Sequence, residues 1–304
     1  MICIMRVFVT GATGFIGSAT VKDLIEAGHQ VVGLARSEEG AARVEAAGAE
    51  VRRGTIDDLD LLRDAAASSD GVIHTAFNHD WSNWAKACET DRLAIEALGE
   101  TLAGSDRPLV VSSGTALIFN PIPGTVATEE TDAPNPPPVP RVSEQTALSF
   151  ADKGVRASAI RLAPTVHGEG DKGFVSMLIG LAREKGIAAY IGDGSNVWPA
   201  VHRFDAARLF RLALESAPAG FRPHATAEQA VPLRKIAEAI GQGLDVPVKS
   251  ITGDEVEPYF GSFVMFAAID NPASSTLTQE RLNWHPEHIG LIADINAGHY
   301  FTQK

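Results

Sequence analysis

The stretch from Met5 to Gly17, MRVFVTGATGFIG, limits the possible folds of this chain more than any other. Its apolar start predicts a buried strand, and the apolar residues after the turn recur at helical spacing. Between them lies a G-x-x-G-x-x-G turn. In such a turn the first glycine permits the sharp bend, the second lets a pyrophosphate approach the amide groups of the new helix, and the third lets that helix pack against the strand. The stretch predicts a dinucleotide site, with a purely structural turn as the alternative. The expected cofactor contacts in it are Gly11, Thr13, Gly14, Phe15 and Ile16, and Gly17 is the packing glycine.

Strand and helix patterns alternate through the first half of the chain. Strand patterns recur near residues 30–34, 49–53, 71–76 and 107–111, with helical patterns between them. Such alternation is typical of an α/β fold with a parallel sheet. We therefore predict a Rossmann-type doubly wound parallel sheet in a dinucleotide-binding domain of residues 1–165. The alternation breaks down afterwards, and residues 166–304 are expected to form mainly a smaller mixed C-terminal lobe, with segments that return to the core of the sheet.

Several small or polar residues stand at the ends of the predicted strands. Ligands of open parallel sheets bind beyond the carboxyl ends of the strands, so these residues are expected around the cofactor. The third strand leads to the place where an adenine ring would lie, and the fourth is followed by small residues that leave room for the cofactor backbone. The loop of residues 77–84 either covers a ligand or lies on the surface. The expected cofactor contacts at these ends are Thr55, Ile56, Thr75, Ala76, Phe77 and Ser112.

Arg36 and Ser37 determine the expected choice of cofactor, because they follow the second strand. An acidic residue there would accept hydrogen bonds from the ribose 2′-hydroxyl of NAD. A guanidinium instead matches a 2′-phosphate with paired donors, and the Ser37 hydroxyl adds a third. The sequence therefore favours NADP(H) over NAD. Alternatively, Arg36 is a solvated charge that Glu38 and Glu39 compensate.

These motifs resemble the extended short-chain dehydrogenase/reductase superfamily, in its NAD-dependent epimerase/dehydratase branch. The resemblance rests on the glycine turn, on Val72-Ile73-His74 and on Ser112-Ser113, and it continues through later segments to the C-terminus. It implies that residues 166–304 supply the substrate lobe and that Pro164 and Val166 lie beside the nicotinamide. It also implies a homodimer in which the helices near 85–103 and 141–153 pair across a two-fold axis. The later segments are Ile160–Gly168, Ile191–Gly194, Trp198–His202 and Leu282–Pro286.

One departure from the family concerns its catalytic pair. Members carry Tyr-x-x-x-Lys on the helix after the fifth strand, and the corresponding positions here hold Pro140 and Glu144. A proline has no proton to transfer, and a carboxylate would raise, not lower, the pKa of a neighbouring phenol. The chain is therefore expected to be an atypical member. Arg141 and Glu144 either face the same cleft, where Arg141 would bind an anionic substrate, or form an ordinary exposed pair, which is the preferred interpretation.

Hydroxyl and imidazole groups are the candidates to replace that pair. Ser113 and Thr115 are expected to hold a carbonyl oxygen, or else only to bond the backbone at the strand end. His167 is the first candidate for a proton donor and His202 the second, because imidazole titrates near neutral pH. His74 is flanked by apolar residues and is interpreted as a core histidine.

The composition narrows the expected partners. A formal net charge of −12 argues against nucleic acid, and no apolar run approaches the roughly 20 residues of a membrane helix. The two cysteines, Cys3 and Cys88, do not suggest a disulfide framework, which fits a reducing, cytoplasmic setting. The histidines show no metal-ligand spacing.

Three functions remain open at this point. The first is an NADP(H)-dependent oxidoreductase of a small carbonyl or alcohol substrate. The second, favoured by the missing catalytic pair, is a non-catalytic NADP(H)-sensing or partner-binding protein. The third is an NAD-dependent sugar epimerase or dehydratase, against which Arg36 and the missing tyrosine argue.

Overall fold

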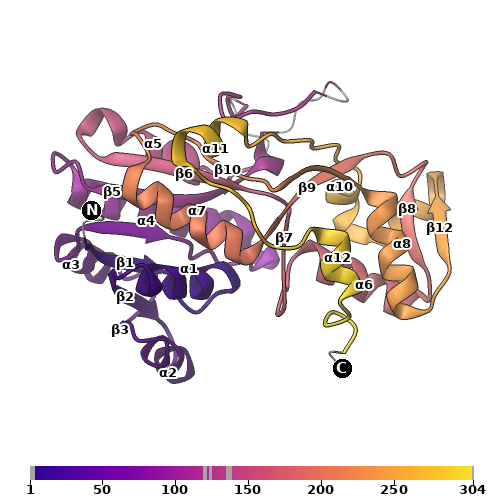
Figure 1. The fold of residues 1–304 in the computed structure, drawn as a ribbon, viewed down its shortest axis with the longest axis horizontal. Coiled ribbons are helices and arrows are strands. Elements are labelled where there is room, and N and C mark those ends of the chain that lie inside the picture. Colours follow the sequence, from indigo (N-terminus) through magenta and orange to yellow (C-terminus); the bar gives the residue numbers. More distant parts are fainter. Residues whose placement is uncertain (1–3, 119–121, 123–124, 135–138, 303–304) are drawn as a thin grey trace.

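A parallel sheet of seven strands forms the centre of the protein (Figure 1). The structure is a computed structural model that describes residues 4–118, 122, 125–134 and 139–302. The strands are β1 (Arg6–Thr10), β2 (Gln30–Ala35), β3 (Glu50–Arg53), β4 (Gly71–His74), β5 (Pro108–Gly114), β6 (Arg156–Leu162) and β10 (His224–Ala225). Their order is β10-β6-β5-β4-β1-β2-β3, and all neighbours are parallel. The order reverses between β1 and β4, which confirms the predicted doubly wound α/β fold.

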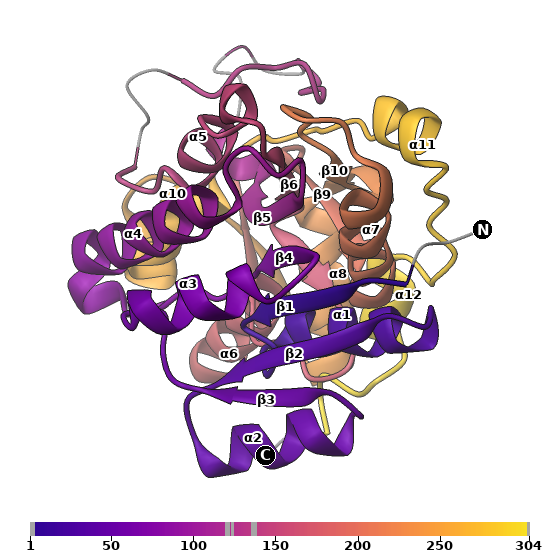
Figure 2. The same ribbon diagram turned by 90° about the vertical axis from the view of Figure 1, so that its left-hand side faces the viewer.

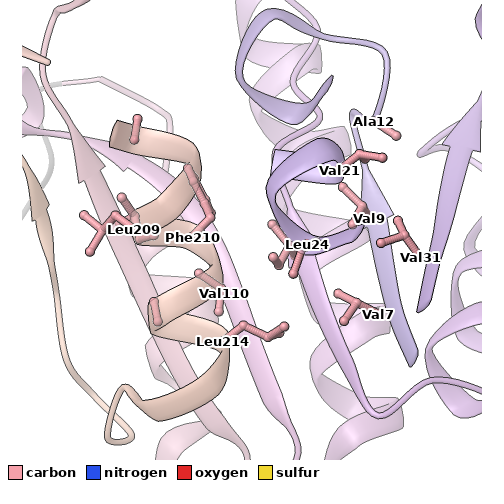
Figure 3. Close-up of a cluster of buried hydrophobic side chains, with 14 of the residues drawn as sticks. Val7, Val9, Ala12, Val21, Leu24, Val31, Val110, Leu209, Phe210 and Leu214 are labelled. Atoms are coloured by element: carbon pink, nitrogen blue, oxygen red, sulfur yellow. The ribbon is translucent and has the colours of Figure 1, made fainter. Parts of the chain in front are cut away.

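Helices cover both faces of this sheet (Figure 2). One face carries α1 (Phe15–Glu26), α2 (Glu38–Ala46) and α7 (Arg203–Ser216), and the other carries α3 (Leu59–Ala67), α4 (Trp84–Leu102) and α5 (Ser143–Leu148). Side chains alternate along a strand, so Val7 and Val9 of β1 pack under α1 while Phe8 packs on the opposite face. Figure 3 shows the first of these cores, to which both Leu24 of α1 and Phe210 of α7 belong.

The second half of the chain adds two small sheets. β7 (Thr165–His167), β9 (Val197–His202) and β11 (Glu228–Pro232) form one, and β8 (Ala188–Ile191) pairs with β12 (Val248–Ile251) in the other. β9 pairs antiparallel with β11 and parallel with β7, which confirms the expected mixed character. β7 starts shortly after β6 ends, so this sheet lies beyond the carboxyl end of β6. The helices around it are α6 (Phe174–Lys185), α8 (Leu233–Leu244), α9 (Val256–Phe260), α10 (Val264–Ala267) and α12 (Leu291–Asn296).

Two later segments return to the large sheet: the stretch that holds α7 and β10, and the stretch that follows α11. α7 and β10 belong to its core, and after α11 (Thr276–Leu282) the fully buried Trp284 packs into the same core. The indole Nε1 of Trp284 donates to the carbonyl oxygen of Asp205, 3.0 Å away, which ties the C-terminal segment to α7. Single helical turns complete the described residues: Trp81–Asn83, Thr115–Leu117, Ala151–Lys153, Gly253–Glu255 and Gly261–Phe263.

None of the helices in the described ranges is long and apolar enough to cross a membrane. Cys88 is a buried free thiol, and Cys3 lies outside the described residues.

Candidate functional site

The glycine turn leaves the first amide groups of α1 open. Gly11 has φ +70°, and a side-chain carbon on it would lie 2.6 Å from the amide nitrogen of Ala76. A carbon on Gly17 would lie 2.0 Å from the carbonyl oxygen of Gly11, so α1 can pack this closely only with glycine there. Gly14 starts the helix, and among the described residues no side chain caps it. Unpaired amides at a helix N-terminus favour a phosphate group, so the turn fits the pyrophosphate of a dinucleotide.

The end of β4 is fastened to the same turn. The hydroxyl of Thr75 donates to the carbonyl oxygen of Thr10, 2.8 Å away, and the amide of Ala76 donates to the Thr10 hydroxyl at 3.4 Å. Thr75 and Ala76 are only half-buried, in contrast to the buried strand before them. The structure therefore brings these two predicted contacts next to Gly11.

Two arginines lie at the neighbouring ends of β2 and β3. Arg36 is exposed and forms no ion pair with any residue that the structure describes. Glu38 instead pairs with Arg53 at the end of β3, and Arg53 also donates to the carbonyl oxygen of Ser37 at 2.9 Å. The Ser37 hydroxyl caps α2 by accepting from the amide of Gly40 at 3.1 Å. In this structure Glu38 therefore neutralises Arg53 and not Arg36.

Sequence reasoning missed Arg53, although the parallel register places it opposite Ala35, directly before Arg36. The adenine contacts predicted after β3 lie nearby: Thr55 is exposed and Ile56 is half-buried against the apolar core of the sheet.

Two of the three predicted hydroxyls at the end of β5 are free for a ligand. The hydroxyls of Ser112 and Ser113 make no hydrogen bond to any described residue, although both residues are buried. The Thr115 hydroxyl donates to Oδ1 of Asn271 at 2.8 Å, and Nδ2 of Asn271 donates to the carbonyl oxygen of Thr115 at 3.1 Å. Thr115 therefore connects the sheet to the C-terminal half, and the sequence holds no signal for this partner.

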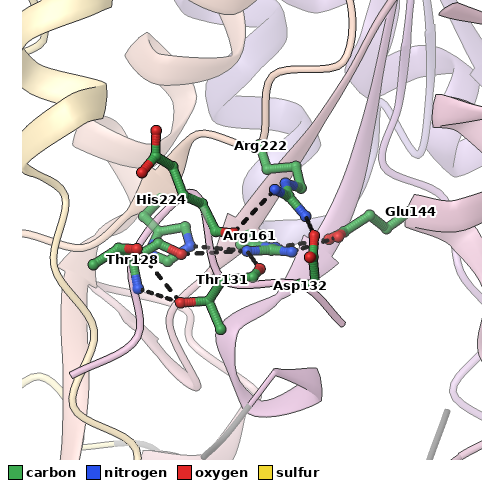
Figure 4. Close-up of polar contacts among 8 residues, drawn as sticks. Thr128, Thr131, Asp132, Glu144, Arg161, Arg222 and His224 are labelled. Carbon is green, nitrogen blue, oxygen red and sulfur yellow. Dashed lines mark hydrogen bonds and ion pairs between the residues drawn. The ribbon is translucent and has the colours of Figure 1, made fainter. Parts of the chain in front are cut away.

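The expected exposed pair of Arg141 and Glu144 is wrong. Glu144 is buried, and its two oxygens accept from Nε and Nη2 of Arg161 at 2.8 and 2.6 Å (Figure 4). Arg161 also donates to the carbonyl oxygen of Thr131 at 2.8 Å. The carboxylate of Glu144 thus neutralises a buried arginine of β6, while Pro140 is exposed.

His74 is a core histidine, as predicted, and it belongs to a buried chain of hydrogen bonds. Its Nδ1 lies 2.8 Å from the Thr10 hydroxyl, and its Nε2 lies 3.1 Å from Asp91 on α4. Asp91 also accepts from the Ser143 hydroxyl at 2.5 Å, and Ser143 accepts from Nε of Arg141 at 3.0 Å. Burial alone would raise the pKa of Asp91, but the hydrogen bonds and charge of His74, helped by Arg141 and Ser143, hold it below its usual value. The chain runs from the glycine turn to the start of α5.

His167 and His202 lie in a second buried group. Nδ1 of His167 is 2.9 Å from Asp294, whose other oxygen is 3.0 Å from Nε2 of His299. Burial and the neighbouring His167 and His288 lower the pKa of His202 to about 4, so His202 is neutral at pH 7. Of the two candidates, only His167 has a carboxylate in contact to orient it. Pro164 and Val166, on the segment that leads to it, are half-buried.

The doubly wound parallel sheet and the glycine turn at the start of α1 define an α/β protein with a Rossmann-type fold. The chain belongs to the NAD dependent epimerase/dehydratase family, whose model matches residues 7–226. An uncharacterized protein of Schizosaccharomyces pombe is 52% identical over 297 residues, which cover 98% of this chain and 100% of the relative. The 2-alkyl-3-oxoalkanoate reductase of Stenotrophomonas maltophilia is 30% identical over 230 residues, 71% of this chain and 67% of the relative. Among solved structures, the dTDP-glucose 4,6-dehydratase DesIV of Streptomyces venezuelae, with NAD bound, shares the fold at a TM-score of 0.77 and 19% identity, over 97% of this chain and 96% of that one.

Proposed function

We propose that the protein is an NADP(H)-dependent oxidoreductase that interconverts a small carbonyl compound and its alcohol. The observation that supports this proposal most is that two features lie at the same edge of the sheet, where the strands end. The open amide groups of α1 follow β1, and the hydroxyls of Ser112 and Ser113, which have no hydrogen-bond partner among the described residues, lie at the end of β5. The first feature suits a dinucleotide and the second suits a carbonyl oxygen. Reductases among the relatives support the same class.

The residues proposed to hold the cofactor lie along that edge. The amides of Phe15 and Ile16 bind the pyrophosphate, and Gly14, whose own amide donates to the carbonyl oxygen of Gly11 at 2.8 Å, lets it approach. The exposed Arg36, with the Ser37 hydroxyl, binds the 2′-phosphate that distinguishes NADP from NAD. When bound, the reduced nicotinamide supplies a hydride to the carbonyl carbon, and a proton on the oxygen completes the alcohol. The remaining proposed contacts are Gly11, Thr13, Thr55, Ile56, Thr75, Ala76, Phe77, Ser112, Pro164 and Val166.

Three side chains are proposed to serve the substrate oxygen. Ser113 donates a hydrogen bond to it, and Thr115 fixes the turn through Asn271. His167 supplies the proton, oriented by Asp294. We further propose a cytoplasmic homodimer that pairs α4 and α5 across a two-fold axis, with a small molecule as substrate.

A second candidate is a non-catalytic NADP(H)-binding protein. It is favoured by Glu144, which is committed to Arg161 in place of activating a tyrosine. The two candidates differ in turnover. We expect the purified protein to oxidise NADPH, followed at 340 nm, with at least one member of a panel of aldehydes, ketones and oxo acids, and the Ser113→Ala variant to lose most of that rate. Tight NADPH binding without turnover across the panel would instead support the second candidate.

A further inference from the structure

The guanidinium of Arg141 lies at the carboxyl ends of β4 and β5, and only some of its N–H groups donate hydrogen bonds to the described residues. Its Nη2 donates to the carbonyl oxygen of Ser112 at 3.2 Å, and its Nε donates to the Ser143 hydroxyl at 3.0 Å. Its central carbon lies 4.2 Å from the centre of the Phe77 ring, directly after β4. Nη1 makes no hydrogen bond to any described residue and is not fully buried.

No carboxylate of the described residues pairs with Arg141. The acid that contributes most to its electrostatic environment, Asp91, accepts from His74 and Ser143 and reaches Arg141 only through the Ser143 hydroxyl. The neighbouring Cys88 is a neutral thiol, because burial raises its pKa. His79 is a neutral imidazole, because desolvation and then the charge of Arg141 lower its pKa.

Arg161 provides an internal comparison. It also lies at a strand end and is fully buried, whereas Arg141 is half-buried, and the two oxygens of Glu144 satisfy its charge directly. A desolvated cation without such a partner is costly, and guanidinium groups are always charged in proteins. Among the described residues, the fold therefore holds a positive charge at the end of β5 without a directly paired carboxylate.

We propose that Arg141 binds a carboxylate of the substrate, so that the substrate is an oxo acid and the product the corresponding hydroxy acid. This inference rests on the proposed oxidoreductase function. The planar guanidinium matches a carboxylate in geometry and charge. Arg141 holds the carbonyl oxygen of Ser112, and Ser113 is the next residue of β5, so the groups proposed for the carboxylate and for the carbonyl oxygen lie at the end of the same strand. Asp91 and Ser143 act as positioning residues that fix the direction of the Arg141 side chain.

The test compares a charged probe with its neutral counterpart. The full-length protein, with and without saturating NADPH, is titrated calorimetrically with 3-oxobutanoate and with methyl 3-oxobutanoate. We expect the acid to bind at least about 10-fold more tightly than the ester. In Arg141→Gln this preference is lost, with an affinity for the acid about 10- to 100-fold weaker, the size expected when hydrogen bonds between charged groups are removed. Arg43→Gln removes the same charge from the exposed side of α2 and should keep the preference.

Further measurements separate this inference from the proposed function. Arg141→Lys keeps the charge but not the planar guanidinium group, and it should bind the acid with intermediate affinity. This variant tests the inference if Arg141→Gln does not fold. NADPH affinity is measured separately and should not change in either variant. If the protein binds the acid through Arg141 but does not bind NADPH, this result would contradict the proposed function and still support an anion site at Arg141. Equal affinity for acid and ester in the unmodified protein, or an undiminished preference in both Arg141 variants, would overturn the inference.

Discussion

At the scale of single residues, the main feature near the candidate site is the buried ion pair between Glu144 and Arg161. A lysine at position 144 would put a second cation beside the buried Arg161. The pair also connects the core to the candidate site, because α5, which carries Glu144, also carries Ser143 and begins two residues after Arg141.

We predict that Glu144→Gln lowers the free energy of unfolding by about 3 kcal/mol or more, because it leaves the buried Arg161 without its countercharge. Urea unfolding followed by circular dichroism measures this change. The matched control is Glu38→Gln, which breaks the exposed pair with Arg53 and should cost less than about 1 kcal/mol. Similar losses in both variants would contradict the assignment of Glu144 to a buried pair.

At the scale of elements, the contact between β1 and α1 determines the shape of the proposed nucleotide site. The helix packs onto its own turn so closely that the carbonyl of Gly11 occupies the space where a side chain on Gly17 would be. The open amide groups at the helix start depend on this contact, because any shift of α1 changes where they point.

We predict that Gly17→Ala destabilises the protein by about 1–3 kcal/mol and weakens NADPH binding more than 10-fold, because the added methyl group forces α1 away from the turn. Thermal unfolding and a fluorescence titration report the two effects. The control is Gly180→Ala in α6, where an added carbon meets nothing within 4 Å. That substitution should stabilise by about 0.5–1 kcal/mol and leave nucleotide binding unchanged.

The elements that the sequence predicted well are those with a strong local pattern. The apolar run of β1, the glycine turn and the alternation up to β5 depend on neighbours within a few residues, so periodicity is sufficient to find them. The interpretation of His74 as a core residue also followed from its flanking apolar residues. The residues next to Arg36 in the sequence could not show whether Glu38 pairs with it, because Arg53, the actual partner of Glu38, lies on another strand.

The polar contacts that shape the candidate site follow no local pattern. Thr115 meets Asn271 across 156 residues of sequence, and His167 meets Asp294 across 127. Helix α5 has only six residues, too few for a helical period to show which side of Glu144 is buried. Only the assembled sheet reveals that Arg141 and Glu144 are not partners.

At the scale of the whole molecule, buried neutral histidines couple stability to pH. Burial, and after it the charge of Arg161, lower the pKa of His224 to about 3, and that of His202 is lowered to about 4. In the unfolded chain both titrate near 6.5. Between these values the unfolded state binds more protons than the folded state, so acid favours unfolding.

We predict that the free energy of unfolding is highest above about pH 6.5 and falls as the pH drops toward 4, by up to about 1.4 kcal/mol per pH unit for each of these histidines. Urea unfolding across this range measures the slope. His224→Asn, which retains a donor toward the carbonyl oxygen of Ser274, should reduce it, whereas His285→Asn on the surface should not. An unchanged slope in His224→Asn would contradict the assignment to His224.

The central claim is that a dinucleotide lies on the open amide groups of α1 with its 2′-phosphate at Arg36. The most direct test is a titration of the purified protein with NADPH and with NADH, followed by intrinsic tryptophan fluorescence. The account predicts saturable binding of both nucleotides, with NADPH bound at least about 10-fold more tightly, the size expected for a charged hydrogen-bonding partner. Tighter binding of NADH, or no binding of either nucleotide at millimolar concentration, would contradict it.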